Sequence, residues 1–518
     1  MKTEKRNRRE FLKLSAAGIA ALSLANKTSA GENINAAPPI ELNEATIFDL
    51  QNGMKSGKYT ARMLVENYLE KIKENDPKIH SVIELNPDAL AIADQSDKER
   101  KRGKMRSMLH GIPILIKDNI DTADRMKTTA GSLALVDAPV PERDAFIVER
   151  LRKAGAVIIG KTNLSEWANF RSTKSISGWS GRGGQTNNPY VLDKNPCGSS
   201  AGTGAAISAN LAAVGIGTET NGSIICPATR NGIVGIKPTL GLVSRSGIIP
   251  IAHTQDTAGP MARTVSDAAI LLGILIGHDK RDSTTADSKK GEKDYTKFLD
   301  KDGLRGARIG VARQYVGNDA KQKSFFESQL DVLRSAGATL IDVNFTEDYG
   351  KMSDDRLLVL LYEFKTDLNK YLGERRANYK TLADLIKYNE DNKERELPLF
   401  GQELFEQSQS KGDLTDKIYK DALNRVKQAA REKGIDAVVV KDKLDAVVAP
   451  ASGATWSIAA VAGYPYITVP AGFSDNLPFG IGFFGQAFTE PKLIKFAYAF
   501  EQKTKARRTP QFLPKIPA

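Results

Sequence analysis

A run of small residues at positions 198–223, GSSAGTGAAISANLAAVGIGTETNGS, constrains the fold more than any other part of the chain. Its pattern predicts one short helix followed by one strand, with a glycine-rich turn before each serine motif. Ser199 and Ser200 open the run and Ser223 closes it. This layout is typical of a nucleophile and a helper group.

A second motif, GIPILIKDN, lies upstream at 111–119. Its apolar residues predict a buried strand, and Lys117 is the last residue of that apolar run. A lysine at the end of a buried strand is a candidate base, because burial favours the neutral amine over the ammonium form.

Short runs rich in Val, Ile and Ala alternate with helical patterns along the chain. We predict strands at 109–116, 156–160, 307–312, 339–343, 446–449 and 466–469, and helices at 46–74 and 324–336, the second ended by Gly337. This alternation predicts an α/β fold with a mixed sheet core covered by helices on both faces. No linker is evident, so we expect one large domain at 31–518, in which the charged segment 348–434 is helical.

The first 30 residues have the pattern of an export signal. A basic head with Arg8 and Arg9 precedes an apolar run at 14–25, and small residues up to Ala30 follow. Paired arginines before an apolar run resemble a twin-arginine signal. The apolar run is shorter than the roughly 20 residues that span a bilayer. We therefore predict cleavage near Ala30, export to the periplasm or another extracytoplasmic space, and no stable membrane insertion.

Charge and motif content argue against several other classes. The net charge is +12 over 518 residues, but the basic residues are scattered among acids, so no nucleic-acid partner is expected. The glycines at 215–217 lack the third glycine of a dinucleotide motif, and no cofactor is predicted. The four histidines, His80, His110, His253 and His278, show no paired metal-ligand spacing, so no metal site is predicted.

Two cysteines, Cys197 and Cys226, flank the serine motifs. This number excludes a disulfide scaffold. Two interpretations remain open, namely small buried core residues or one disulfide formed after export.

Together these segments resemble the amidase signature family of serine hydrolases, and the resemblance extends over nearly all of the chain after about residue 38. Further segments that carry it are 162–170, 197–202, 231–247, 256–268, 463–472 and 480–486. Three others, at 178–190, 360–372 and 399–405, resemble the branch that contains bacterial peptide amidases.

The resemblance implies a catalytic triad. Ser223 would be the nucleophile, Ser199 the bridging serine after a cis peptide bond, and Lys117 the base. The pKa of a free lysine is about 10.4, so burial must bring that of Lys117 close to neutrality.

Backbone N–H groups of Thr220, Asn221 and Gly222 would face the oxyanion. Most family members have glycine where this chain has Asn221. We expect the turn to be kept, because asparagine tolerates left-handed backbone angles, and the departure to affect specificity.

The roles of several neighbours are predicted less narrowly. Ser200 either supports the serine network or caps the following helix, and Asp256 is expected to stabilise a turn near the site. Four aromatic residues are candidates for either the pocket or the core: Trp167, Trp179, Tyr362 and Phe364.

The predicted function is hydrolysis of carboxamide C–N bonds to an acid and ammonia or an amine through an acyl-enzyme. The expected partner is a small amide, including the C-terminal amide of a peptide, and the oligomeric state is left open. Two alternatives are a glutaminase-type subunit of a tRNA amidotransferase and a non-catalytic binding protein on the same fold.

Overall fold

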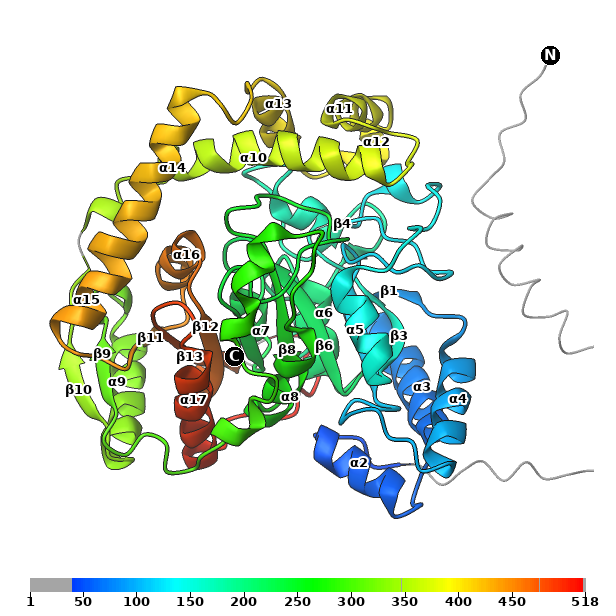
Figure 1. Ribbon diagram of the computed structural model, residues 1–518, viewed down its shortest axis with the longest axis horizontal. Helices are drawn as coiled ribbons and strands as arrows, with labels where there is room; N and C mark the ends of the chain where they lie inside the picture. The colour runs from blue at the N-terminus through cyan, green and yellow to red at the C-terminus, as the bar shows by residue number, and fades with distance from the viewer. Residues whose placement is uncertain (1–39, 346, 475, 516–518) are drawn as a thin grey trace, which may run out of the picture. The chain divides into compact units, whose positions relative to one another are not determined.

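A mixed sheet of eleven strands runs through the computed structural model, which describes residues 40–345, 347–474 and 476–515 (Figure 1). The chain from Ile40 onward forms one compact unit. In spatial order the strands are β1 (Val82–Leu85), β3 (Val157–Thr162), β2 (Pro113–Lys117), β6 (Val214–Glu219), β8 (Thr257–Ala262), β7 (Val234–Lys237), β12 (Tyr466–Ser474), β13 (Leu477–Phe484), β11 (Ala446–Pro450), β9 (Arg308–Val311) and β10 (Thr339–Asp342). A separate two-stranded ribbon joins β4 (Trp179–Ser180) to β5 (Gly184–Gln185).

The sheet combines parallel and antiparallel neighbours. Strands β3, β2 and β6 are parallel, as are β11, β9 and β10, whereas the strands from β6 through β8, β7, β12 and β13 to β11 pair in antiparallel fashion. Each predicted strand is present within a few residues, which confirms the mixed α/β sheet. Strands β1, β7, β8 and β13 were not among the predicted segments.

Helices cover both faces of this sheet. Those around it are α2 (Ile47–Lys55), α3 (Ala61–Ile79), α4 (Ala89–Lys101), α5 (Phe146–Ala154), α6 (Ala201–Ser208), α7 (Ile225–Arg230), α8 (Val265–Leu275), α9 (Ala320–Ser335), α16 (Gly453–Ala462) and α17 (Glu490–Thr504). The predicted helix at 46–74 is two helices, because Thr46 and Thr60 each cap a separate N-terminus. The predicted stop after 336 is confirmed by Gly337, which has φ +94°.

Small residues allow α6 to lie unusually close to the strands beneath it. A Cβ atom on Gly202 would lie 2.4 Å from the backbone oxygens of both Asn163 and Ser81. A Cβ on Gly215 of β6 would lie 2.6 Å from the Thr203 side chain. The composition of the 198–223 segment is therefore a packing requirement.

The segment predicted to be helical at 348–434 contains α10 (Ser353–Glu374), α11 (Leu382–Asp391), α12 (Lys393–Glu396), α13 (Glu403–Gln409) and α14 (Lys417–Ala430), with α15 (Asp436–Lys441) beyond it. In Figure 1 these helices form an arch over one side of the sheet, and we call α10–α14 the cover.

The cover has its own apolar core, in which Trp167 packs edge-on against Phe405 and Phe170 against Phe364. Trp179 packs against Phe400, and Tyr362 stacks on Tyr419. The four aromatic residues considered for the pocket are thus all engaged in packing.

The predicted export signal at 1–30 lies outside the described residues. Within the described ranges, no helix has the length and apolar character needed to cross a bilayer.

Candidate active site

The site lies where the carboxyl ends of two parallel strands meet. Strands β2 and β6 are parallel neighbours, so Lys117 at the end of β2 and Thr218 near the end of β6 reach the same edge of the sheet. Helix α6 begins beside this edge, directly after the Ser199–Ser200 pair.

Lys117 is fully buried and makes three contacts. Its Nζ lies 2.7 Å from Ser199 Oγ, 2.9 Å from Thr218 Oγ1 and 3.3 Å from the Thr218 carbonyl oxygen. Burial lowers the pKa of Lys117 to about 7, although the negative charges of Asp256 and Glu219 oppose this shift. A substantial fraction of this amine is therefore neutral at physiological pH.

Ser199 follows a cis peptide bond after Gly198, as the family resemblance implies. Its carbonyl oxygen accepts a hydrogen bond of 3.1 Å from the Ser165 N–H. A side chain on Gly198 would collide with Ser165, since a Cβ there would lie 2.2 Å from Ser165 Oγ. The glycine is required by this close approach.

Ser200 connects the two serine motifs. Its backbone N–H donates to the Ser223 carbonyl over 3.1 Å. Its hydroxyl donates to the Thr218 carbonyl at 3.1 Å and accepts from the Thr218 N–H at 3.2 Å. The side chain makes no capping hydrogen bond to α6. Of the two predicted roles for Ser200, support of the network is the one observed.

A buried carboxylate binds the backbone that follows the turn from Thr220 to Ser223. Glu219 Oε2 accepts hydrogen bonds from the backbone N–H groups of Ile224, at 2.8 Å, and Ile225, at 3.0 Å. Ser223 follows this turn and is 7% exposed. The backbone directly after Ser223 is thus restrained by Glu219.

The left-handed residue of this turn is Gly222, with φ +84°, and not Asn221. The prediction that Asn221 would need its tolerance of left-handed angles is therefore wrong, because the following glycine takes that conformation. A Cβ on Gly222 would lie 2.3 Å from Trp456 Nε1. The Asn221 amide donates to Ser457 Oγ at 3.2 Å and to Gln255 Oε1 at 3.4 Å, which places α16 against the turn.

Cys197 and Cys226 form a disulfide, with their Cα atoms 5.8 Å apart. The bond joins the segment just before Ser199 to helix α7, just after Ser223. Asn231 supports the same junction, because its amide donates to the carbonyls of Pro196, at 2.9 Å, and Pro227, at 2.7 Å. Of the two interpretations left open by the sequence, the disulfide is the one observed.

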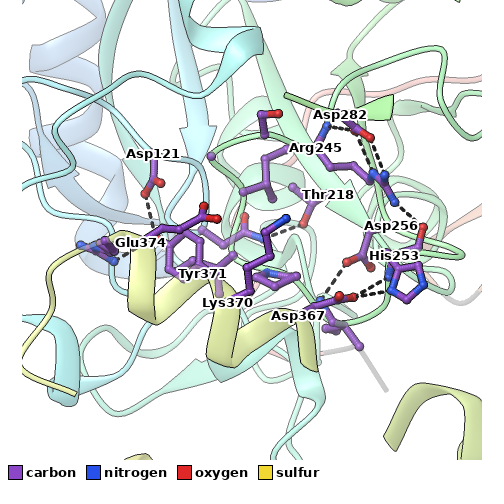
Figure 2. Close-up of a pocket in the computed structure, with 18 of the residues that line it drawn as sticks. Asp121, Thr218, Arg245, His253, Asp256, Asp282, Asp367, Lys370, Tyr371 and Glu374 are labelled. Carbon is purple, nitrogen blue, oxygen red and sulfur yellow. Dashed lines mark hydrogen bonds and ion pairs between the residues drawn. The ribbon is translucent and has the colours of Figure 1, made fainter. Parts of the chain in front are cut away.

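A pocket of about 470 Å³ opens above this edge of the sheet (Figure 2). Its lining includes Thr218, Glu219 and Thr220, which lie beside the Lys117 contact and the Ser223 turn, whereas Lys117, Ser199 and Ser223 are not among its lining residues. Helix α10 crosses the mouth, and its Asp367, Lys370, Tyr371 and Glu374 lie along the pocket in Figure 2. The cover therefore contributes one wall of the pocket.

Both ends of the pocket are polar. At one end the Tyr371 hydroxyl donates to Asp121 over 2.8 Å. At the other end Arg245 pairs with Asp282, and His253 Nδ1 lies 2.8 Å from Asp367 Oδ2.

His253 has a second acidic neighbour in the buried Glu363, whose carboxylate lies 3.7 Å from Nδ1. Together with Asp367, these residues have ligand atoms close enough to surround a cation, a proximity that sequence spacing did not predict. The carboxylate oxygens already accept protein hydrogen bonds, from Thr254 and from His253 itself, so the contacts present are structural.

Sequence reasoning missed Thr218, Asn119 and Glu219 as parts of the site. Asn119 donates to Thr218 Oγ1 at 3.0 Å and so fixes the hydroxyl that contacts Lys117. Their position beside the Lys117 and Ser223 motifs was the available signal. Asp256 was predicted to stabilise a turn, which is confirmed, since its Oδ2 accepts the N–H groups of Ile251 and Ala252 at 2.8 and 2.9 Å.

Comparison with known proteins shows the family and the fold of the chain. The family model described as Amidase matches residues 63–458. The peptide amidase PAM, solved in complex with the competitive inhibitor chymostatin, is 48% identical, with a TM-score of 0.88 over 91% of this chain and 100% of that one. "Probable amidase At4g34880" of Arabidopsis thaliana is 43% identical over 96% of this chain and 97% of its own.

The amidotransferase alternative corresponds to a more distant relative. A subunit of the glutamyl-tRNA(Gln) amidotransferase of Thermoanaerobacter pseudethanolicus is 34% identical over 91% of this chain and 99% of its own. The extent of the family match and the shared fold establish that the chain belongs to the amidase family and is a hydrolase of amide C–N bonds.

Proposed function

We propose that this amidase works through a Ser223–Ser199–Lys117 relay and acts on short peptides or similar acids that end in a carboxamide. The observation that carries the proposal is the distance of 2.7 Å between the buried Lys117 amine and Ser199 Oγ. A buried lysine with a pKa of about 7 accepts a proton readily, whereas an exposed one does not.

In the first step the neutral Lys117 amine takes the Ser199 proton while Ser199 takes the proton of Ser223. The Ser223 oxygen then bonds to the carboxamide carbon, and the electron pair of the C=O bond moves onto oxygen. The C–N bond breaks as the tetrahedral intermediate collapses, and the relay returns its proton to the departing nitrogen. Water later cleaves the acyl–Ser223 ester, releasing the acid and the free enzyme.

The oxyanion in this scheme is bound by backbone N–H groups of the turn at Thr220, Asn221 and Gly222. Such donors are worth about 3–4 kcal/mol of barrier each when they are already in place. Two contacts support this assignment, because both limit movement of the donors. Glu219 restrains the turn, and Gly222 packs against Trp456.

Pocket size and relatives support a peptide-like acyl group. A volume of about 470 Å³ exceeds what a simple amide such as acetamide requires. The polar groups at both ends suit the N–H and C=O groups of a peptide. The likeness to PAM, which is named a peptide amidase, favours the same substrate class here.

The test is ammonia release from a panel of peptide amides by the wild type and by Ser223→Ala. We expect the variant to lose at least about 1,000-fold in kcat, because the nucleophile is absent. The matched control is Ser335→Ala, which removes a hydroxyl that donates to the Val332 carbonyl at the end of α9. Equal ammonia release by the Ser223 variant and the wild type would reject the nucleophile.

A fluorophosphonate probe separates the relay from the substrate class. It should label the wild type at Ser223 whatever acyl group is preferred. Labelling without turnover of any peptide amide would reject the substrate class and keep the relay.

We also propose that the chain is exported by its twin-arginine-type segment to an extracytoplasmic, periplasmic location. The Cys197–Cys226 disulfide supports this, because disulfides persist mainly in oxidising compartments.

A further inference from the structure

One short loop contacts both the catalytic turn and the cover. It comprises residues 251–256, which we call the strap, and it forms part of the pocket wall beside β8. Its polar groups have partners on different parts of the fold, as Figure 2 shows for His253 and Asp367 of α10.

At its carboxyl end the strap is joined to the oxyanion turn. The Thr220 hydroxyl donates to Asp256 Oδ1 over 2.5 Å. The other carboxylate oxygen, Oδ2, accepts the N–H groups of Ile251 and Ala252 within the strap. One oxygen of Asp256 therefore bonds to the turn and the other to its own loop, so this side chain links the strap to the turn.

At its centre the strap is joined to α10. The Thr254 N–H and hydroxyl donate to the buried Glu363 carboxylate at 3.0 and 2.9 Å. The His253 N–H donates to Asp367 Oδ2 at 2.9 Å, and His253 Nδ1 lies 2.8 Å from the same oxygen. Asp367 also lines the pocket, so α10 contacts the substrate space and the strap at once.

We infer that Asp256 is a positioning residue, which holds the oxyanion turn through Thr220 and links the placement of that turn to the docking of α10. This inference rests on the proposed roles of Ser223 and the turn. Asp256 touches no reacting atom in this scheme, and its effect on catalysis is exerted through Thr220.

The reason for such a link is geometric. Displacement of an oxyanion donor by about 1 Å can cost about 100-fold in rate. The Thr220 hydroxyl is directed at the Asp256 carboxylate, so that carboxylate restrains the first residue of the turn. A substrate that holds α10 in its docked position would thereby also hold the oxyanion turn in position.

The first experiment compares Thr220→Val, Thr220→Ser, Asp256→Asn and the Thr220→Val/Asp256→Asn double variant. We expect Thr220→Val and Asp256→Asn each to lower kcat at least about tenfold with KM changed less than about threefold, since transition-state contacts are affected more than binding. Thr220→Ser keeps the hydroxyl and should recover most of the rate.

If Thr220 and Asp256 act as one unit, the losses of kcat caused by their substitution should not be additive in free energy. The double variant should lose no more than either single variant, whereas independent residues would multiply their losses. A multiplied loss, or wild-type kcat in Thr220→Val, would overturn the inference.

The dependence of kcat/KM on pH tests the role of Asp256 separately, because a loss of stability alone would not shift it. The Asp256 and Glu219 charges both raise the pKa of Lys117, so Asp256→Asn should shift the rising limb of kcat/KM to lower pH. Thr220→Val leaves both carboxylates and should not shift the limb. A limb that stays in place in Asp256→Asn would contradict the proximity on which the inference depends.

The cover end of the strap is tested with Asp367→Ala. It removes the acceptor of His253 and should lower kcat in the same direction as Asp256→Asn, with less than additive loss in combination. Asp355→Ala is the matched control, because Asp355 lies on the same helix and pairs with Arg425 on α14 instead of the strap. An equal loss in both variants would mean that only the stability of α10 matters.

Fluorophosphonate labelling distinguishes failure of this inference from failure of the proposed function. If wild-type Ser223 is labelled while the Asp256 and Thr220 variants behave as wild type, the relay stands and the positioning role falls. If wild-type Ser223 is not labelled, the relay itself is wrong.

Discussion

At the scale of the residue, the proposed relay depends on what surrounds the Lys117 amine. Its three contacts are a serine hydroxyl, a threonine hydroxyl and a backbone carbonyl, and none is a carboxylate. Carboxylates at a distance only partly offset burial. A paired lysine would remain charged, so the absence of a direct acid among these contacts is what keeps the amine usable as a base.

This environment predicts a pH dependence. Only neutral Lys117 can accept a proton, so kcat/KM should rise with pH through about pH 7, the pKa of that amine, and then level off. Lys117→Met should lose at least about 1,000-fold, and Lys117→Arg should be equally inactive because a guanidinium stays protonated. The measurement is kcat/KM against pH from 5 to about 9.

A second buried lysine provides the control for that profile. Lys161 on β3 donates to the Ile120 carbonyl at 3.0 Å, and burial lowers its pKa to about 8. If Lys161→Met folds and shifts the rising limb while Lys117→Met remains active, the base has been assigned to the wrong lysine.

At the scale of the element, the contact of α6 with its neighbours determines where the serines lie. Gly202 faces two backbone oxygens, which cannot move aside as the end of a flexible side chain can. We expect Gly202→Ala to lower the free energy of unfolding by about 1–3 kcal/mol through overpacking, and to lower kcat because Ser199 and Ser200 directly precede the same helix. Thermal unfolding and kcat measure the two effects.

The matched substitution is Gly373→Ala on α10. A Cβ there would have no atom within 4 Å, and the residue lies in the last turn of the helix. It should leave the midpoint of thermal unfolding unchanged or raise it, since alanine is favoured over glycine by about 1 kcal/mol in helices. A fall in stability as large as that of Gly202→Ala would show that the close approach of α6 is not the cause.

At the scale of the whole molecule, the disulfide and the predicted signal point to the same compartment. A twin-arginine signal is an address read by a receptor, so replacing Arg8 and Arg9 with lysine should leave the protein in the cytoplasm with an unprocessed N-terminus and reduced Cys197 and Cys226. Cell fractionation and thiol labelling measure this. Arg6→Lys, outside the pair, should be exported normally, and equal export of the paired variant would refute the signal.

Much of the architecture was predictable because buried strands have continuous apolar runs, as in 446–449 and 466–469. Strands β7 and β8 were missed for the opposite reason. Their sequences, VGIK and TAGPMA, contain glycine or proline, and their strand conformation comes from neighbours in the sheet.

The sequence by itself determined the set of candidate reactive groups, since Lys117, Ser199 and Ser223 occur in motifs of small or apolar residues that match the family pattern. Only the tertiary structure decided how the segments that carry these groups are joined: the contact of Lys117 with Ser199, the disulfide between Cys197 and Cys226, and the contact of Asp256 with Thr220. The physical reason is that residue type and local spacing encode chemistry and secondary structure, whereas contacts between distant segments follow from the packing of the whole sheet and its helices.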